Sequence, residues 1–186
     1  MSELSDKALQ KIGRNVVNLS KIEGMLKLFL SRVNFQCPII ELKETLEAKK
    51  KKYETMTLGQ VSQHYFKTYN FNADPIHEYP ENSSESWISF SYDTETDSLE
   101  SQKKDFEFLV EQRNKLIHEL LIDFNPISDN NCRSLINSLD EQNEQIKIQY
   151  KYLQEKLFIL HKSIKQWLLN QLKDINGKTL DEVLRQ

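Results

Sequence analysis

The chain has 186 residues, of which 28% are charged and 38% are hydrophobic, and its formal net charge at pH 7 is −3. This length fits a single domain with its own buried core. The sequence contains no run that approaches the roughly 18 to 20 apolar residues of a membrane-spanning helix, so we expect no membrane protein. The negative net charge argues against a general nucleic-acid-binding protein, because such proteins neutralise phosphates, and any nucleic-acid chemistry must depend on a local basic site.

Termini and cysteines predict a cytoplasmic protein without a bound metal or other cofactor. The first six residues, Met1–Asp6, are acidic and polar, unlike the basic and then apolar start of a secretion signal. Cys37 and Cys132 are far apart and form no C-x-x-C motif, which favours reduced thiols over a disulfide or a zinc site. The scattered histidines have no paired acid or second histidine at metal-ligand spacing.

Scarce turn residues predict long helices, since the chain contains only four glycines and four prolines. Apolar residues recur in steps of three and four from Ser5 to about Phe35 and indicate an amphipathic helix, which Pro38 helps to end. A second helix is predicted over residues 40–53. Thr57-Leu58-Gly59-Gln60 fits a capping box that opens a third helix, which ends near Tyr69.

An irregular insert is predicted over residues 70–100, where Pro, Ser and Glu are frequent. Within it, the stretch Trp87–Tyr92 mixes aromatic, β-branched and small polar residues, which favours one short strand or one arm of a hairpin. Helix is predicted again from Asp97 to Asp123 or Phe124, and Asn125-Pro126 ends it.

The last helix is predicted to be the longest. Ser128 is predicted to cap its start, and a seven-residue repeat follows, formed by Leu139, Ile146, Leu153, Leu160 and Trp167. Gly177 is a typical helix-ending residue, and residues 179–182 fit a second capping box. The sequence therefore predicts one all-α domain over residues 1–186: a helical bundle with a long C-terminal helix and a short, strand-like insert.

Arg113 occupies an unusual place in the predicted helix of residues 97–124. At about 100° per residue, it lies in the middle of the apolar face, among Leu109, Leu116 and Leu120. Burial of an unpaired cation costs several kcal/mol or more, so this guanidinium needs a hydrogen-bond acceptor or a solvent-filled groove.

Asn114 and His118 lie beside this arginine on a polar strip of the same predicted helix. Arginine can hold phosphate oxygens in a bidentate manner, and histidine can move protons at an attacking 2′-hydroxyl or a leaving 5′-oxygen. Together these groups suit the cleavage of a phosphodiester. Arg113 and His118 point about 140° apart on an α-helix, so a cleft between helices or between two copies of the chain is needed to bring both to one phosphate.

The segment Glu111-Gln112-Arg113-Asn114-Lys115-Leu116-Ile117-His118-Glu119 resembles the signature of the HEPN superfamily, an Arg, usually followed by a polar residue, and a His four to six positions later. The resemblance implies an all-α bundle and a metal-independent endoribonuclease. It also implies a homodimer in which both motifs share one cleft. By this resemblance Arg113 and His118 are catalytic and Asn114 positions them. Many members act in toxin–antitoxin, phage-defence or RNA-processing systems, so RNA and an antitoxin or other partner protein are the expected partners.

Two alternatives stay open from the sequence. Arg113 can form a structural ion pair with a buried acid, with His118 merely at the surface, and the chain is then a non-catalytic helical interaction module, as some HEPN members are. A second Arg-Asn pair, Arg14 and Asn15, lies on the first helix without a following His. It either lines the same cleft and binds RNA phosphate or belongs to a solvated helix face.

Overall fold

The computed structural model describes residues 2–69, 87–92, 99–120, 122 and 124–176. The long helices of this part of the chain are α1 (Glu3–Leu30), α2 (Leu42–Glu54), α3 (Leu58–Tyr69), α4 (Leu99–Asn114) and α6 (Asp129–Asn176). A 3-10 turn, η1 (Ile39–Glu41), a π-helical turn, η2 (Lys115–Leu120), and the strands β1 (Phe35–Pro38) and β2 (Trp87–Phe90) complete it. The predicted all-α bundle with a long C-terminal helix is confirmed.

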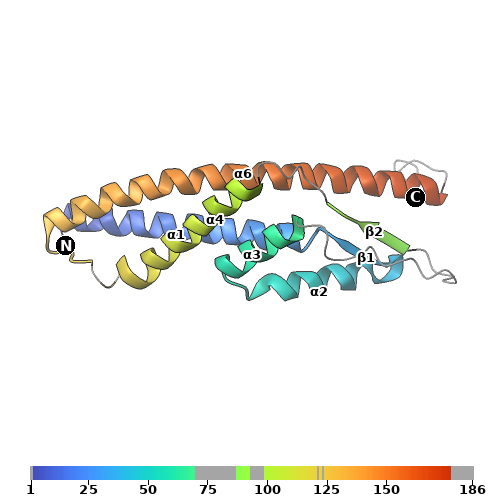
Figure 1. Ribbon diagram of the computed structural model, residues 1–186, viewed down its shortest axis with the longest axis horizontal. Coiled ribbons are helices and arrows are strands. Elements are labelled where there is room, and N and C mark those ends of the chain that lie inside the picture. The colour runs from blue at the N-terminus through green and yellow to red at the C-terminus, as the bar shows by residue number, and fades with distance from the viewer. Residues whose placement is uncertain (1, 70–86, 93–98, 121, 123, 177–186) are drawn as a thin grey trace.

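Helix α6 forms one long side of the molecule, and α1 runs beside it (Figure 1). The predicted heptad positions Leu139, Ile146, Leu153 and Leu160 are all at most 2% exposed. Opposite them, α1 buries a stripe at steps of three and four that includes Ile22, Leu26 and Phe29. Apolar faces of both helices therefore cover each other, which is the main source of stability in such a pair.

A cluster of aromatic side chains joins α1 to α3 and α4. The ring of Tyr65, on α3, lies 5.2 Å from that of Phe29 in an edge-to-face arrangement and 6.2 Å from that of Phe106, on α4. All three residues are at most 1% exposed. Helix α3 approaches α4 closely at Gly59, where a Cβ atom would lie 3.3 Å from the side chain of Val110. The helix that carries the Arg113 motif is thus packed into the core around its middle.

The first helix is shorter than the sequence predicted. It ends at Leu30, and Phe35, expected at the helix end, instead begins β1. Asn34 stands between them with a φ of 50°, a left-handed conformation that Asn tolerates better than most residues. Its side-chain oxygen accepts a hydrogen bond from the Tyr92 amide, and its carbonyl accepts one from Lys49 Nζ, both at 2.9 Å. These bonds hold the chain in the turn that the amphipathic pattern did not reveal.

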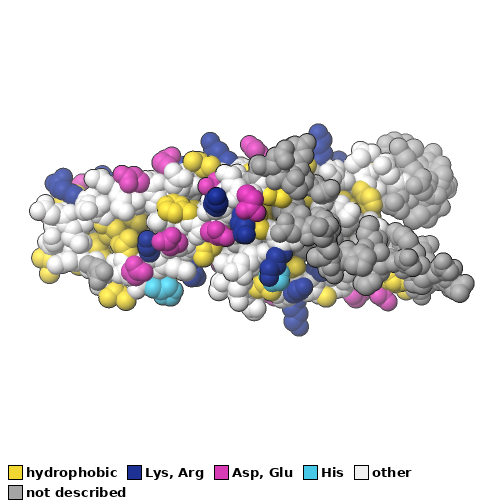
Figure 2. Space-filling view, in the orientation of Figure 1, with side chains coloured by type: hydrophobic (Ala, Val, Ile, Leu, Met, Phe, Trp, Pro, Cys, Tyr) yellow, Lys and Arg dark blue, Asp and Glu magenta, His cyan; other side chains and the backbone are white. Residues whose placement is uncertain are grey.

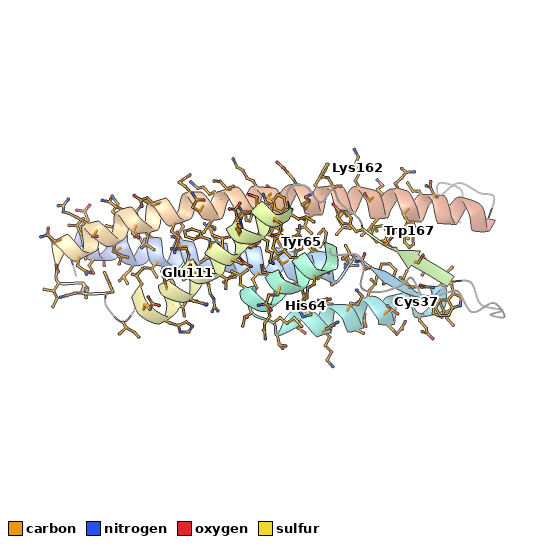
Figure 3. All side chains as sticks on the ribbon, viewed as in Figure 1. Cys37, His64, Tyr65, Glu111, Lys162 and Trp167 are labelled. Carbon is orange, nitrogen blue, oxygen red and sulfur yellow. The ribbon has the colours of Figure 1, made fainter. Side chains whose placement is uncertain are left out.

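The predicted strand is present, and it pairs with a segment that the sequence did not identify as its partner. β1 and β2 form an antiparallel two-stranded sheet in which Phe35 faces Phe90 and Cys37 faces Ile88. The indole ring of Trp167, labelled in Figure 3, lies 6.2 Å from the ring of Phe35 and 5.5 Å from that of Phe90. The distal half of α6 therefore anchors the sheet.

Two helix starts show contacts of the kind that the predicted caps imply. Ser128 Oγ accepts a hydrogen bond from the Asn131 amide at the start of α6, and the Gln60 side chain accepts one from the Thr57 amide at 2.9 Å. The first helix starts at Glu3 with Ser2 as its cap, two residues before the predicted start at Ser5. The predicted loop over residues 70–86, Gly177 and the capping box at residues 179–182 lie outside the described residues.

Cys37 and Cys132 are both buried and are not joined in a disulfide. A membrane crossing needs a long helix of strongly apolar composition, and the described residues contain none.

Candidate functional site

The Arg113 motif straddles a change in helix type. Arg113 and Asn114 are the last two residues of α4, and Lys115 to Leu120 form the π-helical turn η2. The sequence predicted an uninterrupted α-helix here, which the structure corrects. A π-turn is closed by i→i+5 rather than i→i+4 hydrogen bonds, so it rotates less per residue and brings residues five apart closer to one face. The predicted 140° between Arg113 and His118 is therefore an overestimate.

Arg113 is half-buried and has no carboxylate partner among the described residues. Its Nη1 donates a hydrogen bond to the side-chain oxygen of the adjacent Asn114 at 3.2 Å. The side chain lines a small cavity of about 40 Å³ between α1, α3 and α4, together with Ser20, Glu23 and Leu58. Glu23 is the acid in that cavity, and it pairs with Lys27 at 2.7 Å. The guanidinium thus lies in a seam between helices, and it does not form an ion pair with a buried acid among the described residues.

His118 is exposed on η2. It is adjacent in the chain to Glu119, which lines a larger, open groove. Arg113 instead lines the small cavity on the α1 and α3 side. Within one copy of the chain, no hydrogen bond joins Arg113 to His118 among the described residues.

The open groove lies between η2 and the first third of α6 and has a volume of about 350 Å³. Figure 2 shows hydrophobic side chains gathered in a hollow near the end of the molecule that holds the N-terminus, with charged side chains beside it. One wall carries the charged side chains of Lys115 and Glu119. The opposite wall is a polar row on α6, formed by Asn131, Ser134 and Ser138. The sequence reasoning missed this row, although its spacing of three and four residues marks one helix face.

Lys115 is held on its wall by Glu111, whose carboxylate lies 2.7 Å from its Nζ. The hydrogen bond that Lys115 Nζ donates to this carboxylate, together with the negative charges of Glu111 and Glu119, raises the pKa of Lys115 above its ordinary value. Glu111 is labelled on α4 in Figure 3. The cation is therefore fixed beside the groove, one turn from His118 in the chain.

Arg14 and Asn15, the second Arg-Asn pair, lie at the interface between α1 and α6. Arg14 Nη1 donates to a carboxylate oxygen of Asp140 at 2.9 Å, and Lys11 Nζ binds the same carboxylate. The two cations lower the pKa of Asp140, chiefly through their hydrogen bonds. Asn15 is 0% exposed. These contacts give both residues partners inside the protein, and RNA binding by the pair stays a prediction.

Buried amides continue this interface as far as the Arg113 motif. Asn15 Nδ2 donates to the Leu139 carbonyl and to Gln142 Oε1, both at 2.8 Å. Gln142 Nε2 in turn donates to the side chain of Gln112 at 3.2 Å, with a longer contact to its carbonyl at 3.4 Å. Gln112 directly precedes Arg113. The chain of amides therefore fixes α1 and α6 against the end of α4, just before the helix changes type.

No cluster of three or more His, Cys, Asp or Glu side chains suited to a metal ion occurs among the residues that the structure describes. Comparisons with protein-family models, with curated proteins and with solved structures found no match to this chain.

Proposed function

We propose that the protein is a metal-independent endoribonuclease of the HEPN type that acts as a homodimer. The observation that carries the proposal is the state of Arg113: a half-buried guanidinium, held by Asn114 and without a carboxylate partner among the described residues, beside a turn that presents His118 to solvent. A structural arginine in such a seam needs an acid to offset the cost of its burial. A catalytic arginine keeps its hydrogen-bonding edge for a phosphate.

The proposed chemistry needs only the two side chains and the RNA. The 2′-hydroxyl attacks the adjacent phosphorus, the bond to the 5′-oxygen breaks, and the products carry a 2′,3′-cyclic phosphate and a 5′-hydroxyl. His118 moves a proton at one of these oxygens, and Arg113 stabilises the extra negative charge on the phosphorane oxygens. Asn114 holds the guanidinium through the bond to its side-chain oxygen.

The homodimer supplies the geometry that one copy lacks. Arg113 lines the cavity on one side of α4, and His118 is exposed on η2. A two-fold axis close to η2 would place the His118 of one copy near the Arg113 of the other, since a two-fold interface brings the same surface of both copies together. A toxin or phage-defence role, in the cytoplasm and with an antitoxin or other protein partner, is part of this proposal through the HEPN resemblance alone.

The decisive experiment mixes two inactive variants, Arg113→Ala and His118→Ala, under conditions in which subunits exchange. If each site combines Arg113 of one copy with His118 of the other, the mixed dimer contains one intact site. Equal mixing then restores about one quarter of wild-type activity, because about half of the dimers are mixed and one of their two sites works. Restored activity of this size supports a shared site, and two active single variants would refute the catalytic assignment.

Controls separate catalysis from folding and from contamination. His161→Ala removes another exposed histidine, on α6, and should leave cleavage unchanged. Cleavage should persist in excess chelator and stop when the nucleotide at the cut site lacks its 2′-hydroxyl. Cleavage of DNA as well as RNA would contradict the mechanism.

A second candidate function is a non-catalytic helical interaction module. Its support is the outer surface of α6, where Phe158 is 67% exposed, Ile148 55% and Ile159 48%. Exposed apolar side chains of this size on one helix are typical of a surface that a partner covers. This function predicts wild-type behaviour for His118→Ala in every assay and loss of partner binding for Phe158→Ser.

A further inference from the structure

The groove between η2 and α6 has the size and lining of a small-ligand site. Its volume of about 350 Å³ is at the lower end of the range for such sites, roughly 300 to 1,000 Å³. Apolar side chains of Leu120, Phe124 and Leu135 contribute to its surface. An apolar surface with an aromatic ring, between two polar walls, suits a flat ligand whose faces are apolar and whose edge forms hydrogen bonds.

The two polar walls retain hydrogen-bonding groups for such an edge. Ser134 and Ser138 form no hydrogen bond through their hydroxyls with other described residues of the protein, and Glu119 has no cationic partner within 4.0 Å there. Lys115 uses one contact for Glu111 and keeps further N–H donors. The charged wall therefore presents an acceptor and a donor side by side, four residues apart on one turn.

A guanine base matches this wall better than the other RNA bases. Its edge carries the O6 and N7 acceptors, which lysine binds, next to two N–H donors, which one carboxylate can accept together. Adenine, cytosine and uracil do not offer two adjacent N–H donors from separate nitrogens. Phosphate is disfavoured at the same place, because the carboxylate of Glu119 repels it. The face of the base can stack on Phe124, as bases of single-stranded RNA do on aromatic side chains.

We infer that this groove binds a guanine base of single-stranded RNA beside the cleavage position, with Glu119 and Lys115 reading the base edge. The inference rests on the proposed ribonuclease function and adds a sequence preference to it. His118 lies between the two reading residues in the chain, on the same turn η2.

The test measures binding separately from cleavage. Fluorescence anisotropy of the full-length protein uses 2′-O-methyl hexanucleotides, which resist cleavage through the 2′-oxygen: one of uridines alone and one with a single central guanosine. The guanosine oligomer is expected to bind about ten-fold more tightly. Glu119→Gln keeps the shape of the wall but loses the charge, so it should remove most of this difference without weakening binding of the uridine oligomer.

The second variant fills the groove. Ser134→Leu combined with Ser138→Leu places two branched side chains in the groove and should abolish the preference for guanosine. Ser163→Leu, at an exposed position of the same helix, is the matched control and should leave it intact. Thermal melts by circular dichroism confirm that each variant is folded before binding is measured.

The outcomes separate this inference from the proposed function. A guanosine preference that depends on Glu119, in a protein that cleaves no RNA, supports the groove and refutes the ribonuclease. Cleavage that is indifferent to guanosine and to the filled groove supports the ribonuclease and overturns the groove. Equal affinity for both oligomers in the wild type also overturns the groove assignment.

Discussion

Replacement of Asn15 by alanine tests whether the buried amides between α1 and α6 hold the fold together. Asn15 is 0% exposed, and its side chain takes part in three hydrogen bonds: it donates to the Leu139 carbonyl and to Gln142 Oε1, and it accepts from Arg14 Nε. Alanine removes all three. The Leu139 carbonyl keeps the bond from Arg14 Nη2, but Gln142 Oε1 loses its donor in a buried place.

The expected loss of stability follows from these partners. A buried polar atom without a partner costs about 1 to 3 kcal/mol, and the space left by the amide adds to this, so we expect Asn15→Ala to lower the free energy of unfolding by about 2 to 4 kcal/mol. For a chain of this length that is a fall in Tm of roughly 5 to 15 °C. Urea denaturation followed by circular dichroism measures the free energy, with the m-value as a check on the unfolded state.

Asn18 provides the matched control, three residues further along α1. It is only part-buried and has one amide contact, to Asn143 Oδ1 at 3.1 Å, so Asn18→Ala should cost about 0.5 to 1.5 kcal/mol. Equal effects of the two alanine variants would refute the reasoning. So would additive effects of Asn15→Ala and Gln142→Ala, because side chains that share a hydrogen bond must show coupling in a double-mutant cycle.

Three further predictions concern pH, the motif and the sheet. The pKa of Asp140 is lowered below its ordinary 3.8, so the proton binds the unfolded chain more tightly than the folded protein. The ionised Asp140 carboxylate therefore contributes fully to stability above about pH 4, and this contribution is lost as the pH falls through the folded pKa. The difference in Tm between wild type and Asp140→Asn should therefore be largest near neutral pH and should disappear once the pH has fallen below the lowered pKa of Asp140. His118→Ala should change the free energy of unfolding by no more than about 0.5 kcal/mol. Arg113→Ala should lower it by roughly 1 to 2 kcal/mol, because the stem of this side chain packs in the seam between α1 and α3. Equal and large losses of both variants in chemical denaturation would indicate a structural pair. Trp167→Ala should accelerate amide hydrogen exchange in β1 and β2 without affecting α1, and unchanged exchange would mean that the ring contacts do not anchor the sheet.

The sequence predicted elements whose signal is local and periodic. The heptad from Leu139 to Leu160 predicted that the C-terminal helix is long and which of its faces is buried, because a repeat of that length requires one continuous apolar surface. Ser128 predicted the start of the same helix, since its hydroxyl has an amide to cap. The strand at Trp87–Phe90 was recognisable from its residue types.

Elements that depend on distant residues were not predictable in the same way. β1 pairs with a strand about fifty positions away, and nothing near Phe35 marks that partner. The π-turn after Asn114 has no residue signature of its own, because the same residues suit an α-helix. Asn34, in contrast, was a usable signal, because Asn is frequent in turns and tolerates the left-handed conformation that this position adopts.

In the candidate site, too, features with a local periodic signal were predictable and features that depend on distant residues were not. The position of Arg113 within an apolar stripe was evident from helical periodicity, and the structure places it in a seam between helices. Asn15 also lies at the helical spacing of the buried residues Ile12 and Leu19, which marks it as an interior amide rather than a surface one. The groove required the relative placement of η2 and α6, which no single-helix pattern contains.

The pairing of α1 with α6 has a consequence for how the protein is made. Lys11 and Asp140, which meet in this interface, are separated by 129 residues in the chain. At about 5 to 20 residues per second, a ribosome needs roughly 6 to 25 seconds to reach the second residue after the first. During that interval the apolar stripe of α1 has been synthesised and its covering helix has not. The nascent first helix is therefore the segment of this protein that is exposed to misassociation for longest, and native contacts of such long range also slow folding once the chain is released.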